Sequence, residues 1–195
     1  MFDSSEVETP FALVKPDKVQ ANAVKVSDYC SLHKIDWRPH IKTHKSRTIA
    51  ALQMKAGAIG LTVATPREAE VMSTVCDDLL VAYPIWGESK LDRIMNVPRN
   101  VNLMMSIDSS SALKAVTEAA KRAERKVRIL VEVDLGMKRV GLQKIDEIIE
   151  LALLVEQDLD VQYKGIMFYP GHIRERKDSQ TDRLRILQQQ LNQMI

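Results

Sequence analysis

"VRILVEVD" at residues 127–134 alternates between apolar and polar side chains, and this pattern decides the fold class. Ile129, Val131 and Val133 fall on one face of an extended chain, because successive side chains of a strand point to opposite sides. The other face carries Arg128, Leu130, Glu132 and Asp134. The segment is therefore predicted to be a strand with one apolar face and one face that holds charges.

Six further β-rich runs are spaced along the chain, and helical patterns lie between them. The runs cover residues 11–14, 36–43, 60–65, 78–84, 102–108 and 164–170. Strands that alternate with helices form a parallel sheet with helical crossovers. Strand starts about 20 to 35 residues apart fit a (β/α)8 TIM barrel, which needs eight units over about 250 residues. With about six units here, either the sheet is open or the chain stops before the barrel closes.

The final helical pattern favours the second alternative, because it runs to Ile195 without a C-cap signal. We therefore expect residues 1–195 to form one α/β domain, an incomplete barrel of about six βα units without a C-terminal β-domain.

Helical patterns fill the segments between the strands. Residues 65–74 begin with Thr65 as N-cap, Pro66 in the first turn and Glu68 in a capping box. An Ala-rich amphipathic pattern follows Asp108. Two further segments carry apolar stripes, formed by Ile145, Ile148, Ile149, Ala152 and Val155 in one and by Leu184, Leu187, Leu191 and Ile195 in the other.

Composition argues against several classes of protein. Of the 195 residues, 45% are hydrophobic and 28% charged, as in an ordinary soluble protein. The formal net charge of +2 does not indicate a nucleic-acid partner. No apolar run approaches the ~18 residues of a transmembrane helix, and the acidic start is unlike a signal peptide. Cys30 and Cys76 lack metal-ligand spacing, so we expect a cytoplasmic protein with reduced thiols, no membrane partner and no metal in this segment.

The stretch "RPHIKTHKS" at residues 38–46 concentrates basic side chains. In an extended chain Arg38, His40 and Lys42 share one face, and Trp37, Pro39 and Ile41 share the other. In a barrel the basic face is the interior, where an unpaired cation is costly. Glu132, on the inner face of its own strand, is a candidate partner for Arg38 or His40.

Lys42 would then lie near the carboxyl end of its strand, where barrels and open α/β sheets have their active sites. A partly desolvated lysine beside other cations loses its proton more readily and can attack an aldehyde to form a Schiff base. The same position also suits a lysine that anchors a phosphate or carboxylate, or one that is solvated. Spacing alone leaves these alternatives open.

Four motifs together resemble a known family. They are "RPHIKTHKS", "GLTVATPREAEVM" at 60–72, "VEVDLGMKRVGL" at 131–142 and "GIMFYPGH" at 165–172. They occur in the order seen in the fold-type III pyridoxal-phosphate enzymes related to D-threonine aldolase and D-serine dehydratase, which share the barrel of the alanine racemase N-terminal domain. The resemblance covers nearly the whole chain and implies the Schiff-base role for Lys42.

The resemblance implies roles for particular residues. Lys42 matches the lysine that holds pyridoxal 5'-phosphate, while Lys45 is expected to be a solvated or substrate-side charge. Arg139 matches the arginine that reaches the phenolic oxygen of the cofactor, Tyr169 a residue beside the cofactor, and His172 a histidine that borders the active site. His40 and Arg38 belong to the signature that supports the lysine.

Each assignment has a purely structural alternative. Arg139 could equally be a surface charge at the start of a helix, and Tyr169 an aromatic side chain of the barrel core. His172 could equally be a loop residue that closes a turn with Gly171. Glu132 and Asp134 are interpreted as internal salt-bridge partners rather than acid–base catalysts.

The implied activity is that of a lyase acting on D-amino acids as small-molecule substrates. In the aldolase and dehydratase branch, the family has its divalent-metal ligands and other substrate contacts in a C-terminal β-domain, which this sequence does not reach. The alternatives are an amino-acid racemase and a non-catalytic pyridoxal-phosphate carrier. Members of the family commonly form homodimers, so a homodimer is a further expectation.

Overall fold

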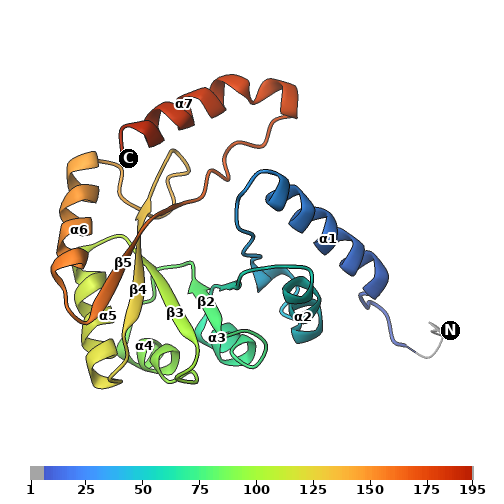
Figure 1. Cartoon of the computed structure of the whole chain (residues 1–195), viewed down its shortest axis with the longest axis horizontal. Coiled ribbons are helices and arrows are strands. Elements are labelled where there is room, and N and C mark those ends of the chain that lie inside the picture. Colours follow the sequence, from blue (N-terminus) through green and yellow to red (C-terminus); the bar gives the residue numbers. More distant parts are fainter. Residues whose placement is uncertain (1–6, 195) are drawn as a thin grey trace.

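The computed structural model describes residues 7–194, which contain a five-stranded parallel sheet (Figure 1). The strands are β1 (Leu61–Val63), β2 (Asp78–Val81), β3 (Asn102–Ile107), β4 (Val127–Val133) and β5 (Val161–Phe168). They lie in chain order, and each pairs in parallel with the next. The predicted α/β fold is confirmed, and successive parallel neighbours joined by helices are the arrangement of part of a (β/α) barrel.

In the described part of the chain, seven α-helices connect or flank the strands. They are α1 (Pro16–Leu32), α2 (Arg47–Lys55), α3 (Pro66–Met72), α4 (Glu88–Met95), α5 (Ser110–Arg122), α6 (Ile145–Gln157) and α7 (Thr181–Asn192). Figure 1 shows α3 to α6 along the outside of the sheet, with α1 and α7 on either side of its open end. Within residues 7–194, none of the helices is both long and apolar enough to cross a membrane.

The core lies between the sheet and these outer helices. Ile129, Val131 and Val133 of β4 are all at most 2% exposed and belong to one cluster with side chains of α3 to α6. The alternation of residues 127–134 therefore predicted the buried face correctly. Because the helices cover only this face, the other face of each strand forms the concave inner side of the sheet.

The prediction of a strand at residues 36–43 is mostly wrong. Only His40 makes a bridge, to Thr62 of β1, and Ile41–Thr43 form the 3-10 helix η2. Pro39 and Ile41 are buried as predicted, so the chain turns once Ile41 has reached the core. No strand forms at 11–14 either, and those side chains are exposed.

Two helices differ in detail from their predicted stripes. On α6 the buried face is formed by Ile148, Leu151 and Val155, whereas Ile149 is 52% exposed. On α7 only Leu187 and Leu191 of the predicted stripe pack against the core, and Leu184 remains exposed. Ile195, the last member of that stripe, lies outside the described residues.

A register shift interrupts the pairing of β4 with β5. Ile129 lies opposite Tyr163, but Val131 lies opposite Ile166, so β5 has one extra residue there. Gly165 within this segment has φ +111°, a backbone conformation that side chains disfavour.

The inner face carries an ion pair at the amino-terminal edge of the sheet. Asp78 at the start of β2 contacts Arg38 Nη1 at 2.6 Å through Oδ1 and Arg128 Nη2 at 2.8 Å through Oδ2. The predicted pairing of Glu132 with Arg38 or His40 is therefore wrong for Arg38. Glu132 lies four residues beyond Arg128 on β4, roughly 13 Å further along the strand.

Replacing Asp78 should test how much this triad stabilises the fold. Asp78→Ala leaves two arginines without a counter-ion, so we expect the free energy of unfolding to fall by about 2–3 kcal/mol, less than for a fully buried pair. Urea unfolding measures the change. Asp182→Ala, which removes an exposed i,i+3 partner of Arg185, is the control and should cost under about 0.5 kcal/mol. Equal effects of the two substitutions would contradict a stabilising role for the triad.

Candidate functional site

Lys42 lies in η2, immediately beyond the bridge of His40 with β1. Ile41 is fully buried and anchors the turn, while the Lys42 side chain is exposed on the concave side. His40 Nδ1 accepts a hydrogen bond from the backbone N–H of Lys42 at 3.3 Å. Burial lowers the pKa of His40, and the nearby Lys42 charge lowers it further. His40 therefore holds the backbone of Lys42 as a neutral acceptor.

A second histidine fixes the chain just after Lys42. His44 Nδ1 accepts the backbone N–H of Ser46 at 3.1 Å, and Ser46 Oγ in turn caps α2 by accepting the N–H of Ile49. Burial also lowers the pKa of His44. The turn that carries Lys42 thus has an imidazole acceptor on each side.

Lys45 is tied to the neighbouring helix rather than free in solvent. Its Nζ lies 3.2 Å from Oε1 of Glu68, although the lysine side chain is 65% exposed. Glu68 Oε2 accepts the N–H of Ala64 at 2.8 Å, and Thr65 Oγ1 accepts the N–H of Glu68. The predicted N-cap Thr65 and Pro66 in the first turn are confirmed, whereas Glu68 accepts the N–H of Ala64 rather than that of Thr65. Glu68 additionally joins the loop after Lys42 to the start of α3.

The loop after β4 is organised by Asp134. Its carboxylate accepts the N–H groups of Gly136 and Lys138 at 2.9 and 3.0 Å, and the side-chain amide of Gln143 at 2.9 Å. Burial alone would raise the pKa of Asp134, but these hydrogen bonds outweigh it and lower the pKa. Asp134 thus shapes the loop that carries Arg139. It was predicted to be a salt-bridge partner, but its hydrogen-bond partners are backbone and side-chain amides.

Glu132 is a buried carboxyl group on the inner face. It is 3% exposed and accepts a hydrogen bond from Ser106 Oγ at 2.9 Å. Burial raises the pKa of Glu132, and the nearby Asp108 raises it further, while Ser106 and Arg139 oppose the shift. Within residues 7–194 it has no salt bridge, so its predicted role as an ion-pair partner is wrong.

Three predicted site residues converge at the carboxyl-terminal edge of the sheet. Lys42 Nζ lies 5.9 Å from the centre of the Tyr169 ring, and Arg139 Cζ lies 5.7 Å from the same centre. Arg139 also lies 5.9 Å from the ring of Tyr83, which follows β2. These distances are those of cation–π contacts. Sequence analysis missed Tyr83, although its position near the end of the run predicted at residues 78–84 was an available signal.

His172 lies beside the loop that carries Arg139, but no contact joins it to Lys42. A Cβ atom on Gly136 would come within 3.2 Å of His172 Nε2, so only glycine leaves room for the ring in its present position. Gly136 also has φ +113°. The Nδ1 atom of His172 is buried and has no hydrogen-bond partner among the described residues.

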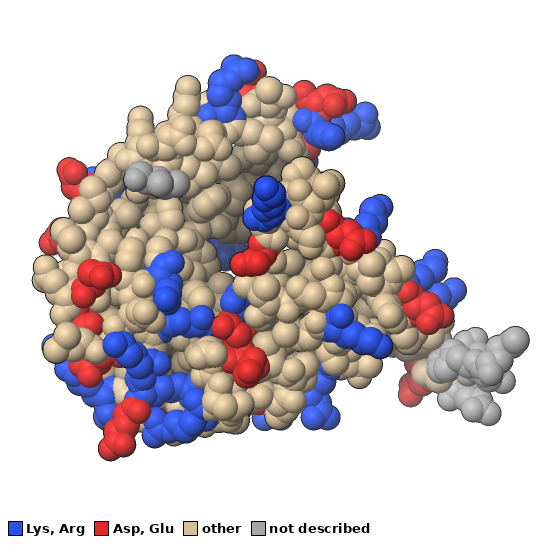
Figure 2. All heavy atoms as spheres, viewed as in Figure 1, with Lys and Arg blue, Asp and Glu red and all other residues tan. Residues whose placement is uncertain are grey.

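The arrangement suits a flat, anionic ligand. Two cationic side chains, Lys42 and Arg139, share the Tyr169 ring, and Tyr169 and Tyr83 are both about half exposed. Figure 2 shows that the molecule is hollowed near the middle of the viewed face, between the body of the sheet and the arm formed by the first helices. An exposed amine, a guanidinium and aromatic faces can together bind, orient and stack such a ligand.

Comparison with known proteins shows the family of the chain. The model of the family described as "Alanine racemase, N-terminal domain" matches residues 14–195, and the chain belongs to this family. It is 28% identical to a 3-hydroxy-D-aspartate aldolase of Paracoccus denitrificans over 93% of this chain and 47% of that protein. It is also 28% identical to a D-threonine aldolase of Arthrobacter over 89% of this chain and 47% of the relative.

Solved structures give the same result. The crystal structure of D-threonine aldolase from Filomicrobium marinum superposes with a TM-score of 0.92 at 25% identity, over 98% of this chain and 53% of that one. An alanine racemase from Streptomyces lavendulae superposes with a TM-score of 0.76 at 22% identity, which shows a shared fold. The chain spans about half the length of the curated relatives it matches.

His40 and His44, on either side of Lys42, should make the free energy of unfolding depend on pH. The pKa of each is lowered in the folded state, so the unfolded chain binds more protons and stability is lost as pH falls below about 6.5. Urea unfolding between pH 7.5 and pH 5 should therefore show a declining free energy. Replacing both by asparagine, which accepts backbone N–H groups without titrating, should flatten this decline.

His33→Asn is the matched control for that experiment. The His33 ring packs beside Tyr29 and accepts no backbone N–H in the described part of the chain. A flattening by His33→Asn as large as that by the His40 and His44 substitutions would rule out the two backbone hydrogen bonds as the cause.

Glu132 should reduce stability at neutral pH. Because burial raises the pKa of Glu132, the folded state prefers the protonated form and loses stability as pH rises through the folded pKa. Glu132→Gln keeps an acceptor for Ser106 and removes the titration, so the free energy of unfolding at pH 7 should rise by about 1 kcal/mol. Urea unfolding measures it, with Glu150→Gln on the exposed side of α6 as control. A less stable Glu132→Gln protein would show that the charged carboxylate is favoured.

Proposed function

We propose that the protein is a pyridoxal-phosphate-dependent enzyme that acts on D-amino acids, as a lyase of the D-threonine aldolase and D-serine dehydratase type. Lys42 is the proposed cofactor lysine. The observation that supports this most directly is the convergence of Lys42 and Arg139 on the Tyr169 ring at the carboxyl-terminal edge of the sheet. Membership of the alanine racemase N-terminal family supports it independently.

The residues present fit the cofactor. An aromatic aldehyde with acidic groups needs an amine, a cation and a surface on which to stack, and Lys42, Arg139 and Tyr169 supply these. Lys42 would hold the cofactor through Nζ, Arg139 through its guanidinium and Tyr169 through its ring. His172 Nδ1, which is buried and has no hydrogen-bond partner within residues 7–194, is one more polar atom close to the same loop.

The chain contributes position and electrostatics. His40 fixes the backbone of Lys42 by accepting its N–H, and so directs the amine toward the concave side. Arg139 lies between the faces of Tyr83 and Tyr169, which orient its guanidinium. Pyridoxal phosphate, when bound, supplies an electron sink for negative charge at the α-carbon of an amino acid.

A lyase is favoured over a racemase by the extent of the similarity. The aldolases and dehydratases match along 85–93% of this chain, whereas an alanine racemase of Oceanobacillus iheyensis, also 28% identical, matches along 63%. A small D-amino acid with a β-hydroxyl group, such as D-threonine or D-serine, is therefore the proposed substrate.

Borohydride reduction after incubation with pyridoxal phosphate tests the cofactor lysine. We expect a long-wavelength absorption band before reduction and, after proteolysis, a mass tag on the peptide that contains Lys42. Lys42→Ala should abolish both. Lys45→Ala, three residues away and paired with Glu68, should retain both.

The location of the tag decides the assignment. A tag that persists in Lys42→Ala, or the absence of any band in the unsubstituted chain, would contradict the proposed role of Lys42. Assays of D-threonine cleavage and D-serine deamination then separate an enzyme from a carrier: a tag on Lys42 without turnover would favour the non-catalytic pyridoxal-phosphate carrier.

A further inference from the structure

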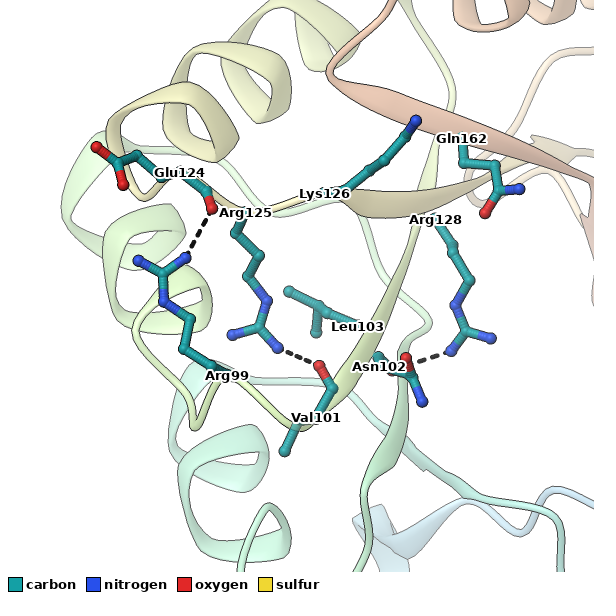
Figure 3. Close-up of a pocket in the computed structure, with 9 residues that line it drawn as sticks. All are labelled: Arg99, Val101, Asn102, Leu103, Glu124, Arg125, Lys126, Arg128 and Gln162. Atoms are coloured by element: carbon teal, nitrogen blue, oxygen red, sulfur yellow. Dashed lines mark hydrogen bonds between the residues drawn. The ribbon is translucent and has the colours of Figure 1, made fainter.

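A second basic pocket lies at the opposite edge of the sheet from Lys42. It is lined by Arg99, Asn102, Arg125, Lys126, Arg128 and Gln162, and Figure 3 shows these side chains around the amino-terminal ends of β3, β4 and β5. In Figure 2, Lys and Arg atoms gather over the corresponding region at the lower left, where α4 and α5 lie in Figure 1. Because the strands are parallel, this edge is separated from the Lys42 cluster by the length of the sheet.

Arg125 at the back of the pocket is a buried cation without a carboxylate. It is 8% exposed, and its guanidinium donates to the carbonyls of Met95, Val97, Pro98 and Val101. No salt bridge neutralises it within residues 7–194, and burial, followed by the charge of Arg99, lowers the pKa of Arg125. Its positive charge therefore acts on the pocket.

Arg128 is only partly paired. Its Nη2 donates to Asp78 and to the carbonyl of Asn102, while its Nε is buried and has no partner among the described residues. A buried donor without an acceptor is unusual in a folded protein, and an acceptor atom of a ligand would satisfy it.

The remaining side chains of the pocket are available to a ligand. Arg99 donates one hydrogen bond, to the carbonyl of Glu124, and Lys126 and the side-chain amide of Gln162 make none in the described part of the chain. Four cations line the pocket against the single carboxylate of Glu124. Asp78 offsets Arg128 from the other side.

We propose that this pocket binds a phosphate dianion, either inorganic phosphate or the phosphate group of a small phosphate monoester. Arg125 and Arg128 supply fixed positive charge from the back of the pocket, and Arg99 and Lys126 close on the oxyanion from its rim. The amide of Gln162 donates to a further oxygen. Arginines and lysines around a concave surface are the usual partners of phosphate oxygens.

Helix capping accounts for only part of this cluster. Arginines that bind carbonyls at helix ends stabilise the negative end of the helix dipole, and Arg125 and Arg99 do so at the ends of α4 and α5. Capping leaves unexplained the orphaned Nε of Arg128 and the unpartnered Lys126 beside it.

Titration of the full chain with inorganic phosphate at low ionic strength, followed by calorimetry, tests the proposal. We expect saturable binding that weakens as salt rises and is about fivefold weaker in Lys126→Gln. The Lys126 side chain makes no hydrogen bond or ion pair within residues 7–194, so this variant should keep its fold. Lys90→Gln on α4 removes a lysine outside the pocket whose side chain likewise makes no hydrogen bond or ion pair in the described part of the chain. This variant, and Lys42→Ala at the other edge, should both bind as the unsubstituted chain does.

The possible outcomes are distinct. Equal binding by Lys126→Gln and Lys90→Gln, or loss of binding in Lys42→Ala alone, would overturn the proposal. A small alkyl phosphate monoester that competes with inorganic phosphate would identify a site for phosphorylated metabolites, whereas binding of inorganic phosphate alone would identify an ion site. Binding of RNA without binding of either small phosphate would also overturn it.

Discussion

Parallel pairing of the five strands is the constraint on which the other features depend. It places the carboxyl ends of all strands at one edge, so that residues from η2, the loop after β4 and the end of β5 meet although they are far apart in sequence. The same pairing places the strand starts at the other edge, where Asp78 holds Arg38 and Arg128.

The concave inner face is polar because charged side chains lie at both edges of the sheet. The surroundings of these charges differ between the two edges. At the strand starts, ion pairs satisfy most of the charge. At the strand ends, the cations are surrounded instead by the imidazole of His40, the carboxyl group of Glu132 and the aromatic face of Tyr169. Aromatic faces and neutral imidazoles leave a cation available to a ligand, whereas a carboxylate partner would occupy it.

Much of the sheet could be predicted from local alternation, because burial on one face repeats every second residue, as residues 127–133 illustrate. The strand at 36–43 could not, since the polar-apolar pattern there continues through a 3-10 turn. Lys42, Arg139 and Tyr169 were grouped through family resemblance, and their proximity is not encoded in spacing. The pairing of Asp78 with Arg38 and Arg128, and of Glu68 with Lys45, depends on contacts between distant segments, which no local pattern specifies.

The extra residue of β5 near Gly165 has a consequence for chemistry. Up to Tyr163 the odd-numbered residues of β5 match the helix-facing residues of β4, but beyond the bulge Ile166 and Phe168 take that place. The parity of the strand is thus reversed, and Met167 and then Tyr169 turn toward the concave side. Without that single insertion, the aromatic ring shared by Lys42 and Arg139 would be directed to the outer layer of helices. The extra residue of β5, in a segment where Gly165 has φ +111°, therefore determines on which side of the sheet a ligand can stack.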